Sequence, residues 1–449
     1  MLHGFGFSVD EFLLVQEARV FASGHLAASI PVEWRPYIEA IQPLYVRTNE
    51  DRSLLTTGYF PGSAALYALF EKGGVGPLLN PTLAAGSVVL TAHIARRAFP
   101  ETPEVAVLAA ILLASSPQFL FTAMTPYAMT AHLFLNLAWL AFFIRDTRLG
   151  HFGAMVVGVA AVWQHQLHIH PLFALPFLAD LAFRRSAWRL AATYVLVYGV
   201  ALAGCMSWRA LVLGGAAINL AADQIEAGGV GYMMRRIITG IIAERSVLEP
   251  LYWIASQLRF ATWQTPMLLV LAACGLLTIR RAPRVIRLLT IGLPLALLPS
   301  FLLVTEQGIG WGFRYIHVHL GTLSLLAAWA VIELKQRTLN LQEWHRMAGG
   351  LIVIGLLTGP TLIVWRFVDF SSVVLPYRAV HTIFRDLDAE VLITGHTVLV
   401  RNDFVFRDTP KLLWLPALSD DQLSELCKHW NVAPVPREIL ARISFGGTS

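Results

Sequence analysis

Long runs of apolar residues recur along most of this 449-residue chain. A helix needs about 20 mostly apolar residues to cross the hydrocarbon core of a bilayer. Such runs lie near 77–96, 105–122, 127–144, 150–166, 168–183, 188–213, 263–279, 285–304, 314–334 and 347–366. Only 14% of the residues are charged, whereas soluble domains carry about a quarter. The sequence therefore predicts an all-α polytopic membrane protein with about ten to eleven transmembrane helices.

Several classes of protein are disfavoured by what the chain contains. The three cysteines, Cys205, Cys274 and Cys427, form neither a disulfide framework nor a zinc pattern. No phosphate-binding glycine loop precedes a helix, which argues against a nucleotide-driven motor. Ionisable residues are nearly absent midway through the apolar runs, although ion-coupled transporters keep them there. The net charge of +5 needs no nucleic-acid partner, because the basic residues gather in loops that membrane topology explains.

The loops between the apolar runs alternate in character. One set is basic and contains Arg96, Arg97, Arg145, Arg148, Arg184, Arg185, Arg189, Arg280, Lys335, Arg337 and Arg346. The positive-inside rule places this set in the cytoplasm. The other set lies at 122–129, 164–170, 214–262 and 305–315, and must face outward. The first 60 residues and the tail from about residue 370 fall on the same outer side.

This alternation divides the chain into two expected domains. Residues 1–369 would form the transmembrane domain, with 1–60 as a first outer loop that carries short interfacial helices and 214–262 as a long outer loop. In that long loop, Arg235 and Arg236 adjoin apolar residues at helical spacing, which fits an interfacial helix or a lid over a site. Residues 370–449 would form a small outer α/β domain.

Two local patterns support the α/β interpretation of the tail. The stretch "EVLITGHTVLVRNDFVF" predicts a pair of short strands. Ser419 and Gln422 have the spacing of a capping box at the start of a helix.

Polar residues that could carry chemistry gather on the outer face in four clusters. They are Asp10 and Glu11; Tyr59 in "YFPG"; His165, His168 and His170; and Trp311, Arg314 and Tyr315 in "GWGFRY", with Glu306 just before them.

The order of these motifs resembles bacterial membrane glycosyltransferases of the GT-C fold. The resemblance is to the family-39 type, related to protein O-mannosyltransferases and to aminoarabinose transferases of lipid A. It rests on "DEFLLVQEARVFASG", "YFPG", "LLNPTLAAGSVVLTAHIARRAF", "ASSPQFLFTAM", "HQLHIHPLFALPFL" and "GWGFRY", and covers roughly residues 8–335. In "ASSPQFLFTAM" the resemblance implies a helix break at "SP". In "YFPG", Phe60 replaces one proline of the family turn.

The resemblance implies a specific activity and location. Such enzymes take a sugar from a polyprenyl-phosphate carrier and transfer it to an acceptor on the outer, periplasmic side of the bacterial inner membrane. The acceptor hydroxyl could belong to a protein, a lipid or a polysaccharide. The aspartate of the first outer loop is regarded as the catalytic base, or as a metal ligand in some branches.

Physical chemistry gives the candidate residues matching roles. Glycosyl transfer needs a group that accepts the proton of the attacking hydroxyl, which Asp10 can do. The alternative for Asp10 is a capping carboxylate at a helix start. Glu11 points about 100° away on the helix, so a structural contact is its alternative to a catalytic role. Arg314 suits the phosphate of the leaving group, and its alternative is an anchor that snorkels at a helix end.

The remaining candidates, Tyr59 among them, are assigned to substrate binding. Trp311 and Tyr315 could form a sugar platform or belong to the interfacial aromatic belt. His165 and His168 would share a helix face if the helix continues, whereas His170 precedes Pro171, which disfavours helix. Hydrogen bonds to donor or acceptor are one interpretation of these histidines. A divalent metal at Asp10, His165 and His168 is the other, and no other cofactor is implied.

The sequence thus predicts a glycosyltransferase dependent on a polyprenyl-phosphate sugar. A flippase or transporter for a lipid-linked saccharide, or a noncatalytic envelope assembly protein, remains an alternative. Family members carry a transmembrane helix before the Asp-Glu pair, and here only "MLHGFGFSV" precedes it. We therefore expect about 20 residues of a first span to be missing from this sequence.

Overall fold

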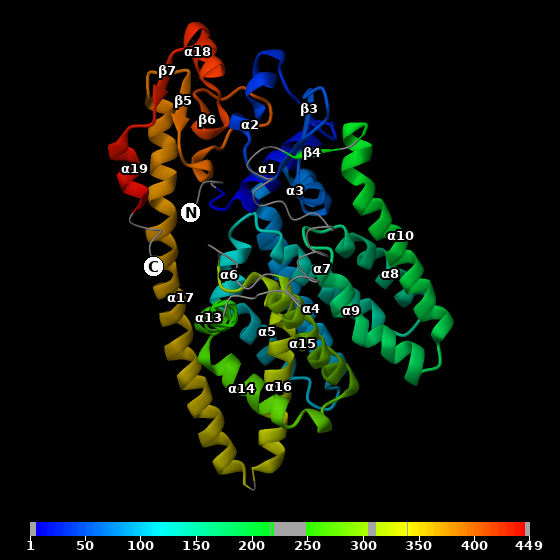
Figure 1. The fold of residues 1–449 in the computed structure, drawn as a ribbon. Helices are drawn as coiled ribbons and strands as arrows, with labels where there is room; N and C mark the ends of the chain where they lie inside the picture. Colours follow the sequence, from blue (N-terminus) through cyan, green and yellow to red (C-terminus); the bar gives the residue numbers. More distant parts are fainter. Residues whose placement is uncertain (1–5, 216, 220–247, 304–310, 339, 445–449) are drawn as a thin grey trace. The chain divides into compact units, whose positions relative to one another are not determined.

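A computed structural model describes residues 6–215, 217–219, 248–303, 311–338 and 340–444 (Figure 1). The chain forms two compact units. Unit 1 comprises Met1–Gly76, Met206–Tyr232 and Phe367–Ser449, and unit 2 comprises Pro77–Cys205 and Met233–Arg366. The C-terminal part of unit 1 begins at Phe367, close to the domain boundary predicted at residue 370. Unlike the predicted C-terminal domain, however, unit 1 also contains the N-terminal segment. The interfacial helix expected around Arg235 and Arg236, and Glu306, lie outside the described residues.

Unit 2 is helical. Its helices are α4 (Leu79–Ala98), α5 (Val105–Ala114), α6 (Pro117–Ala123), α7 (Met129–Phe143), α8 (Arg148–Val162), α9 (Ile169–Ala179), α13 (Glu249–Thr262), α14 (Pro266–Leu277), α15 (Arg284–Leu303) and α16 (Leu320–Arg337). Helices α10 (Trp188–Leu213) and α17 (Leu341–Asp386) contribute residues to both units. One apolar core runs through unit 2 and includes the fully buried Trp139 and Leu326.

Fewer helices are long enough to span a membrane than the ten to eleven predicted from the sequence. Five helices in the described part of the chain are long and apolar enough to cross a membrane, or up to seven if each bent pair is one span. The runs at 127–144 and 150–166 form the shorter helices α7 and α8. The run at 168–183 forms the 11 residues of α9 and the π-helical turn Asp180–Arg184 that continues it. A break before Pro117, capped by Ser116, separates α5 from α6 with a bend of 64°. This break confirms the one expected from "SSP".

The apolar helices differ sharply in burial. The most apolar stretch of α16 is 89% buried, whereas that of α17 is only 6% buried. Apolar side chains such as Leu356, Leu357 and Val364 project outward from α17. An exposed apolar face of this length would be costly in water but is what a lipid environment requires. The chain is therefore a mostly helical polytopic membrane protein, as its sequence predicts.

The basic loops of unit 2 are joined to one another by ion pairs. Arg284 contacts Asp180 at 2.6 Å, and Lys335 contacts Glu104 at 3.7 Å. Arg281 contacts Glu333 at 3.5 Å. Asp146 also pairs with an arginine of the neighbouring loop, Arg185. These pairs bring the loops after α4, α7, α9, α14 and α16 to one end of unit 2, so the predicted basic set shares one face.

The N-terminal part of unit 1 contains a sheet that the sequence does not predict. Helices α1 (Val9–Ala22), α2 (Ile38–Ile41) and α3 (Gly62–Lys72) accompany strands β1 (Ala28–Ser29), β2 (Val46–Thr48), β3 (Leu54–Thr57) and β4 (Ile218–Asn219). The antiparallel order is β1-β3-β2-β4. Short helices were expected in residues 1–60, and α2 is one of them, but the strands of this segment were not predicted. Strands β2 and β3 flank the polar turn "NEDRS", where Arg52 adopts a φ of 55°.

The C-terminal part of unit 1 is α/β. Strands β5 (Val391–Thr394), β6 (Lys411–Trp414) and β7 (Val432–Pro434) form a parallel sheet in the order β6-β5-β7, with helices α18 (Asp420–His429) and α19 (Arg437–Ser444). The capping box of Ser419 and Gln422 is confirmed. Of the expected strand pair only β5 forms. The prediction of a second strand directly after β5 is wrong. The partner of β5 is the later strand β6, because parallel strands need a crossover connection between them.

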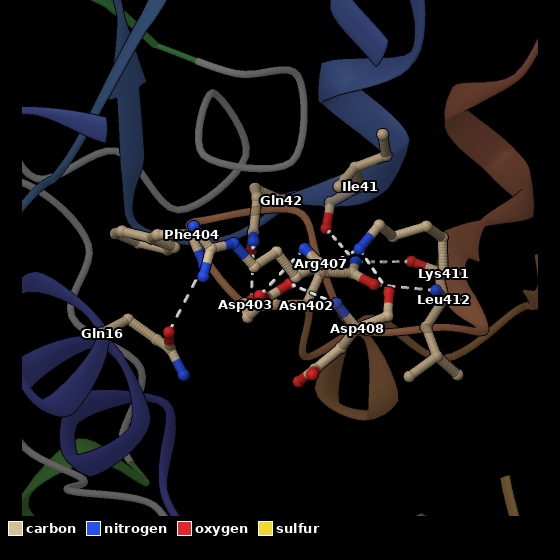
Figure 2. Close-up of polar contacts among 10 residues, drawn as sticks. All are labelled: Gln16, Ile41, Gln42, Asn402, Asp403, Phe404, Arg407, Asp408, Lys411 and Leu412. Atoms are coloured by element: carbon tan, nitrogen blue, oxygen red, sulfur yellow. Dashed lines mark hydrogen bonds and ion pairs between the residues drawn. The ribbon is translucent and has the colours of Figure 1, made fainter. Parts of the chain in front are cut away.

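Asn402 explains why its segment forms no strand. Its side-chain amide donates to the carbonyls of Ile41 at 2.6 Å and Leu412 at 2.8 Å, and its oxygen accepts from the Leu412 amide at 2.8 Å. Gln42 donates to the Asn402 carbonyl at 2.9 Å. One buried side chain thus takes the hydrogen-bonding role of a neighbouring strand and ties the C-terminal segment to α2 (Figure 2).

A buried ion pair also contributes to this junction. Lys411 is 2% exposed and lies 3.4 Å from the Asp403 carboxylate, which also accepts from the amide of Arg407 at 3.0 Å (Figure 2). Gln16 of α1 accepts from the amide of Phe404 at 3.3 Å. The segment that contains Asn402 and Asp403 is therefore held by both α1 and the end of α2.

Replacing Asn402 tests this junction. Asn402→Ala leaves two carbonyls and one amide without partners in a buried place, so we expect a loss of about 2–4 kcal/mol in unfolding free energy. Denaturant unfolding of the purified protein, followed by intrinsic tryptophan fluorescence, measures the change. Arg407→Ala is the matched control, because that exposed side chain lies in the same segment. Equal stability of the two variants would contradict the assignment.

Candidate active site

Asp10 and Tyr59 lie together in unit 1. Asp10 occupies the first turn of α1, and its half-buried carboxylate accepts a hydrogen bond from the Tyr59 hydroxyl. The ring of Tyr59 stacks on that of Tyr45, with centroids 5.6 Å apart. Tyr59 stands just before α3, which begins at Gly62 in the "YFPG" turn. The structure therefore brings together two residues that the sequence assigned to separate clusters.

Glu11 has a structural contact. Ser8 caps α1, and its hydroxyl accepts from the Glu11 amide at 3.2 Å, while the Glu11 carboxylate accepts from the Ser8 amide at 2.7 Å. Glu11 is fully buried and also interacts electrostatically with Arg401. This capping box fixes the start of α1 and so positions Asp10. The cap proposed for Asp10 itself belongs to Ser8.

Glu17 was missed from the sequence. It is 3% exposed, and its two carboxylate oxygens accept from the hydroxyls of Thr56 and Thr57, each at 2.9 Å. Burial raises the pKa of Glu17 to about 7, although these hydroxyls and the charge of Arg209 oppose the shift. The spacing could have revealed it, because residues seven apart lie on nearly the same face of a helix. Glu17 thus shares the face of Asp10.

Arg209 approaches the same segment from α10. Its guanidinium donates to the carbonyl of Gly58 and lies over the ring of Phe60, 5.1 Å from the centroid. Residues 56–62 are therefore held by Glu17 on one helix and by Arg209 on another. In this arrangement Phe60 supplies the ring beneath a cation.

Arg314 is held by two tyrosines in unit 2. It donates to the hydroxyls of Tyr127 at 2.8 Å and Tyr315 at 3.1 Å, and lies 5.1 Å from the ring centroid of Tyr315. Asn80 of "NP" donates to the backbone carbonyl of Tyr127 at 2.8 Å. Tyr127 therefore contacts the "NP" motif through its backbone carbonyl and the arginine through its hydroxyl.

Gln118 organises the backbone before Arg314. Its amide donates to the carbonyl of Phe313 at 3.0 Å and contacts His317 at 3.3 Å. Gly312 adopts a φ of 69°, and a side chain there would collide with Gln118. The second glycine of "GWGFRY" is therefore required by both conformation and space. Gln118 was not among the predicted residues.

Trp311 and the histidines also lie in unit 2. Trp311 is buried, and the centroid of its ring lies 6.2 Å from that of Trp263, with the two ring planes tilted by 47°. His170 is fully buried, 2.9 Å from the Asn136 amide oxygen and edge-on to Trp139. Helix α8 ends at Val162 and α9 begins at Ile169. His165 and His168 therefore do not lie on one helix, and the expectation that they share a helix face is wrong.

The predicted residues are divided between the two units. Asp10, Glu11 and Tyr59 belong to unit 1, while Trp311, Arg314, Tyr315 and the three histidines belong to unit 2. Within the described ranges, no group of three or more His, Cys, Asp or Glu could hold a metal ion. The metal at Asp10, His165 and His168 and the catalytic roles stay predictions.

Comparisons with known proteins return distant likenesses of fold. No family model and no curated protein matches the chain. The structure is similar to that of ArnT from Cupriavidus metallidurans bound to undecaprenyl phosphate, with 17% identity, a TM-score of 0.45, and coverage of 89% of this chain and 70% of that one. For the apo state of ArnT the values are 16%, 0.44, 90% and 71%. No role of an individual residue follows from identities this low.

Glu17 makes the stability of unit 1 depend on pH. The pKa of Glu17 is about 7 in the folded protein, above the ordinary value of 4.5. Between pH 4.5 and 7 the native state therefore binds a proton that the unfolded chain has released. This stabilisation, on the order of 3 kcal/mol, should be present below pH 4.5 and lost as pH rises through 7. Glu17→Gln should remove that slope from denaturant unfolding measured between pH 4.5 and 8. The exposed Glu33→Gln should retain it, and an unchanged slope in Glu17→Gln would refute the assignment.

Proposed function

We propose that this chain is an integral membrane glycosyltransferase that uses a polyprenyl-phosphate-linked sugar. The acceptor is a hydroxyl on the periplasmic side of the bacterial inner membrane. The observation that carries the proposal is the Asp10 carboxylate, half-buried and hydrogen-bonded to Tyr59 at the start of a firmly capped helix. The order of motifs in the sequence supports the same activity.

Asp10 has the chemistry of the base in this reaction. A half-buried carboxylate can still reach a substrate hydroxyl, and it takes the proton as the hydroxyl attacks the anomeric carbon. Tyr59 donates to one carboxylate oxygen, Oδ1, which stabilises the ionised form. The capping box of Ser8 and Glu11 fixes the backbone that carries Asp10. Attack from the face opposite the phosphate would invert the anomeric centre.

Arg314 has the chemistry that the leaving group requires. As the bond to the sugar breaks, negative charge grows on the carrier phosphate, and a preorganised cation stabilises it. The guanidinium is already fixed by Tyr127 and Tyr315, so it needs little reorganisation. His165, His168 and His170, with Trp311, are proposed to contact the donor or the acceptor.

The proposed orientation follows from the basic loops. Ion pairs gather them at one end of unit 2, and an excess of Arg and Lys marks the cytoplasmic end of membrane helices. Arg314 begins the 3-10 turn Arg314–His319 that leads into α16, whereas Lys335 and Arg337 lie at the end of α16. The reaction would therefore take place at the outer end.

Asp10→Asn tests the proposed base. Removal of a general base typically costs between about 10²- and 10⁴-fold in rate, so we expect kcat to fall at least about 100-fold. The assay uses purified protein in proteoliposomes with a radiolabelled polyprenyl-phosphate sugar. Asp51→Asn makes the same chemical change in an exposed turn and should leave turnover intact. Turnover of Asp10→Asn within threefold of the parent would refute the role.

Arg314→Gln and Arg314→Lys test the phosphate contact. Gln removes the charge, and loss of one such donor typically costs about 100-fold in kcat. Lys keeps the charge but not the fork, so we expect an intermediate rate. The exposed Arg346→Gln should match the parent in the same assay. Equal rates for Arg314→Gln and Arg346→Gln would contradict the assignment.

A further inference from the structure

A polar cavity lies within unit 1. Its volume is about 440 Å³, it is lined by α1, the last turns of α17 and the segment from Arg401 to Leu412, and it is open to solvent on one side. Ligand pockets commonly measure about 300–1,000 Å³. The cavity is therefore larger than a bare inorganic anion requires and has room for a small polar molecule.

Two helices present regular stripes to this cavity. Arg378, His381, Thr382 and Arg385 of α17 line it at the spacing that puts residues on one helix face. Phe12, Gln16 and Arg19 of α1 line it at the same kind of spacing. The two faces place hydrogen-bonding groups around a common space.

The lining carries an excess of positive charge. Arg19, Arg378, Arg385 and Arg401 contribute four guanidinium groups, against the carboxylates of Asp403 and Asp408. Arg19 already pairs with Glu71 at 3.3 Å, and Asp403 pairs with Lys411 at 3.4 Å. The guanidinium groups of Arg378 and Arg385 have no ion pair or hydrogen bond to any residue that the structure describes.

Arg401 adds a fixed charge to the wall. Its guanidinium donates to the carbonyls of Gly6 and Phe7 and lies 5.8 Å from the ring centroid of Phe12. Burial lowers the pKa of Arg401 to about 10, so the group remains charged at neutral pH. Like charges that share a cavity repel one another, and an anion between them would relieve that repulsion.

The cavity is not the proposed catalytic site. On α1, Asp10 and Glu17 lie on nearly one face, because seven residues amount to about two turns. Phe12 and Arg19 are also seven apart, but they lie about 180–200° around the helix from Asp10. A ligand in the cavity would therefore contact the opposite face of α1.

We propose that this cavity binds a phosphate monoester of a small hydroxyl-bearing molecule. The guanidinium groups of Arg378 and Arg385 hold the phosphate, for which the planar fork of arginine is suited. Gln16, Thr382, Thr409 and Asp408 offer partners for hydroxyl groups. The bound ligand would hold α1, α17 and the segment from Arg401 to Leu412 together, and would stabilise unit 1 by mass action.

The ligand chemistry could come from a soluble sugar phosphate or from a lipid head group. Binding is measured on the full purified chain by calorimetry with glucose 6-phosphate, with glucose and sodium sulfate at equal ionic strength as comparisons. In parallel, thermal unfolding is compared in nanodiscs of phosphatidylcholine with and without phosphatidic acid. Saturable binding of glucose 6-phosphate identifies a soluble source, and stabilisation by phosphatidic acid alone identifies a lipid source.

Three variants decide whether the effect belongs to this cavity. Arg378→Gln combined with Arg385→Gln should weaken the dissociation constant of the active probe at least tenfold. Asp408→Asn removes a negative charge that opposes the anion and should lower the dissociation constant severalfold. An unfolded variant could not show such tighter binding. Arg407→Gln, exposed and outside the lining, should leave it unchanged. Binding of neither probe, equal binding of sulfate, or an unchanged constant in the double variant would overturn the proposal.

Discussion

The hydrocarbon core of a bilayer offers no partner to a backbone amide or carbonyl, and the rest of this structure follows from that constraint. Backbone groups in lipid must be satisfied within helices, which unit 2 provides. Charged side chains are consequently displaced to the helix ends. There they form the ion pairs between basic loops at one end and the Tyr127–Arg314–Tyr315 contacts in the turn that precedes α16. The reactive groups proposed here lie where the lipid no longer excludes polar chemistry.

Helix α1 concentrates much of the polar chemistry of unit 1. Its start is fixed by Ser8 and Glu11, one face carries Asp10 and the buried Glu17, and the opposite face carries Gln16 and Arg19. The C-terminal segment depends on the same helix, because Gln16 binds the backbone of Phe404 and Arg401 binds that of Gly6 and Phe7.

The sequence predicted what depends on spacing along the chain. The helical class, the break at Pro117, the capping box at Ser419 and the shared face of the basic loops are all local or periodic features. It did not predict the strands between residues 28 and 57, because their short runs acquire their register only from partners as distant as Ile218. Glu17, Gln118 and Asn402 were missed for a similar reason. Their roles depend on burial and on partners from 39 to 361 residues away.

The formation of a glycosidic bond is the central claim of this account. It is tested most directly by incubating the reconstituted protein with a polyprenyl-phosphate sugar labelled with ¹³C at the anomeric carbon, together with candidate acceptors, and following that carbon by NMR. The account predicts a new glycosidic linkage of inverted configuration and release of the carrier phosphate. Labelled lipid that crosses the bilayer with its sugar still attached, and no new linkage, would contradict it and identify a transporter instead.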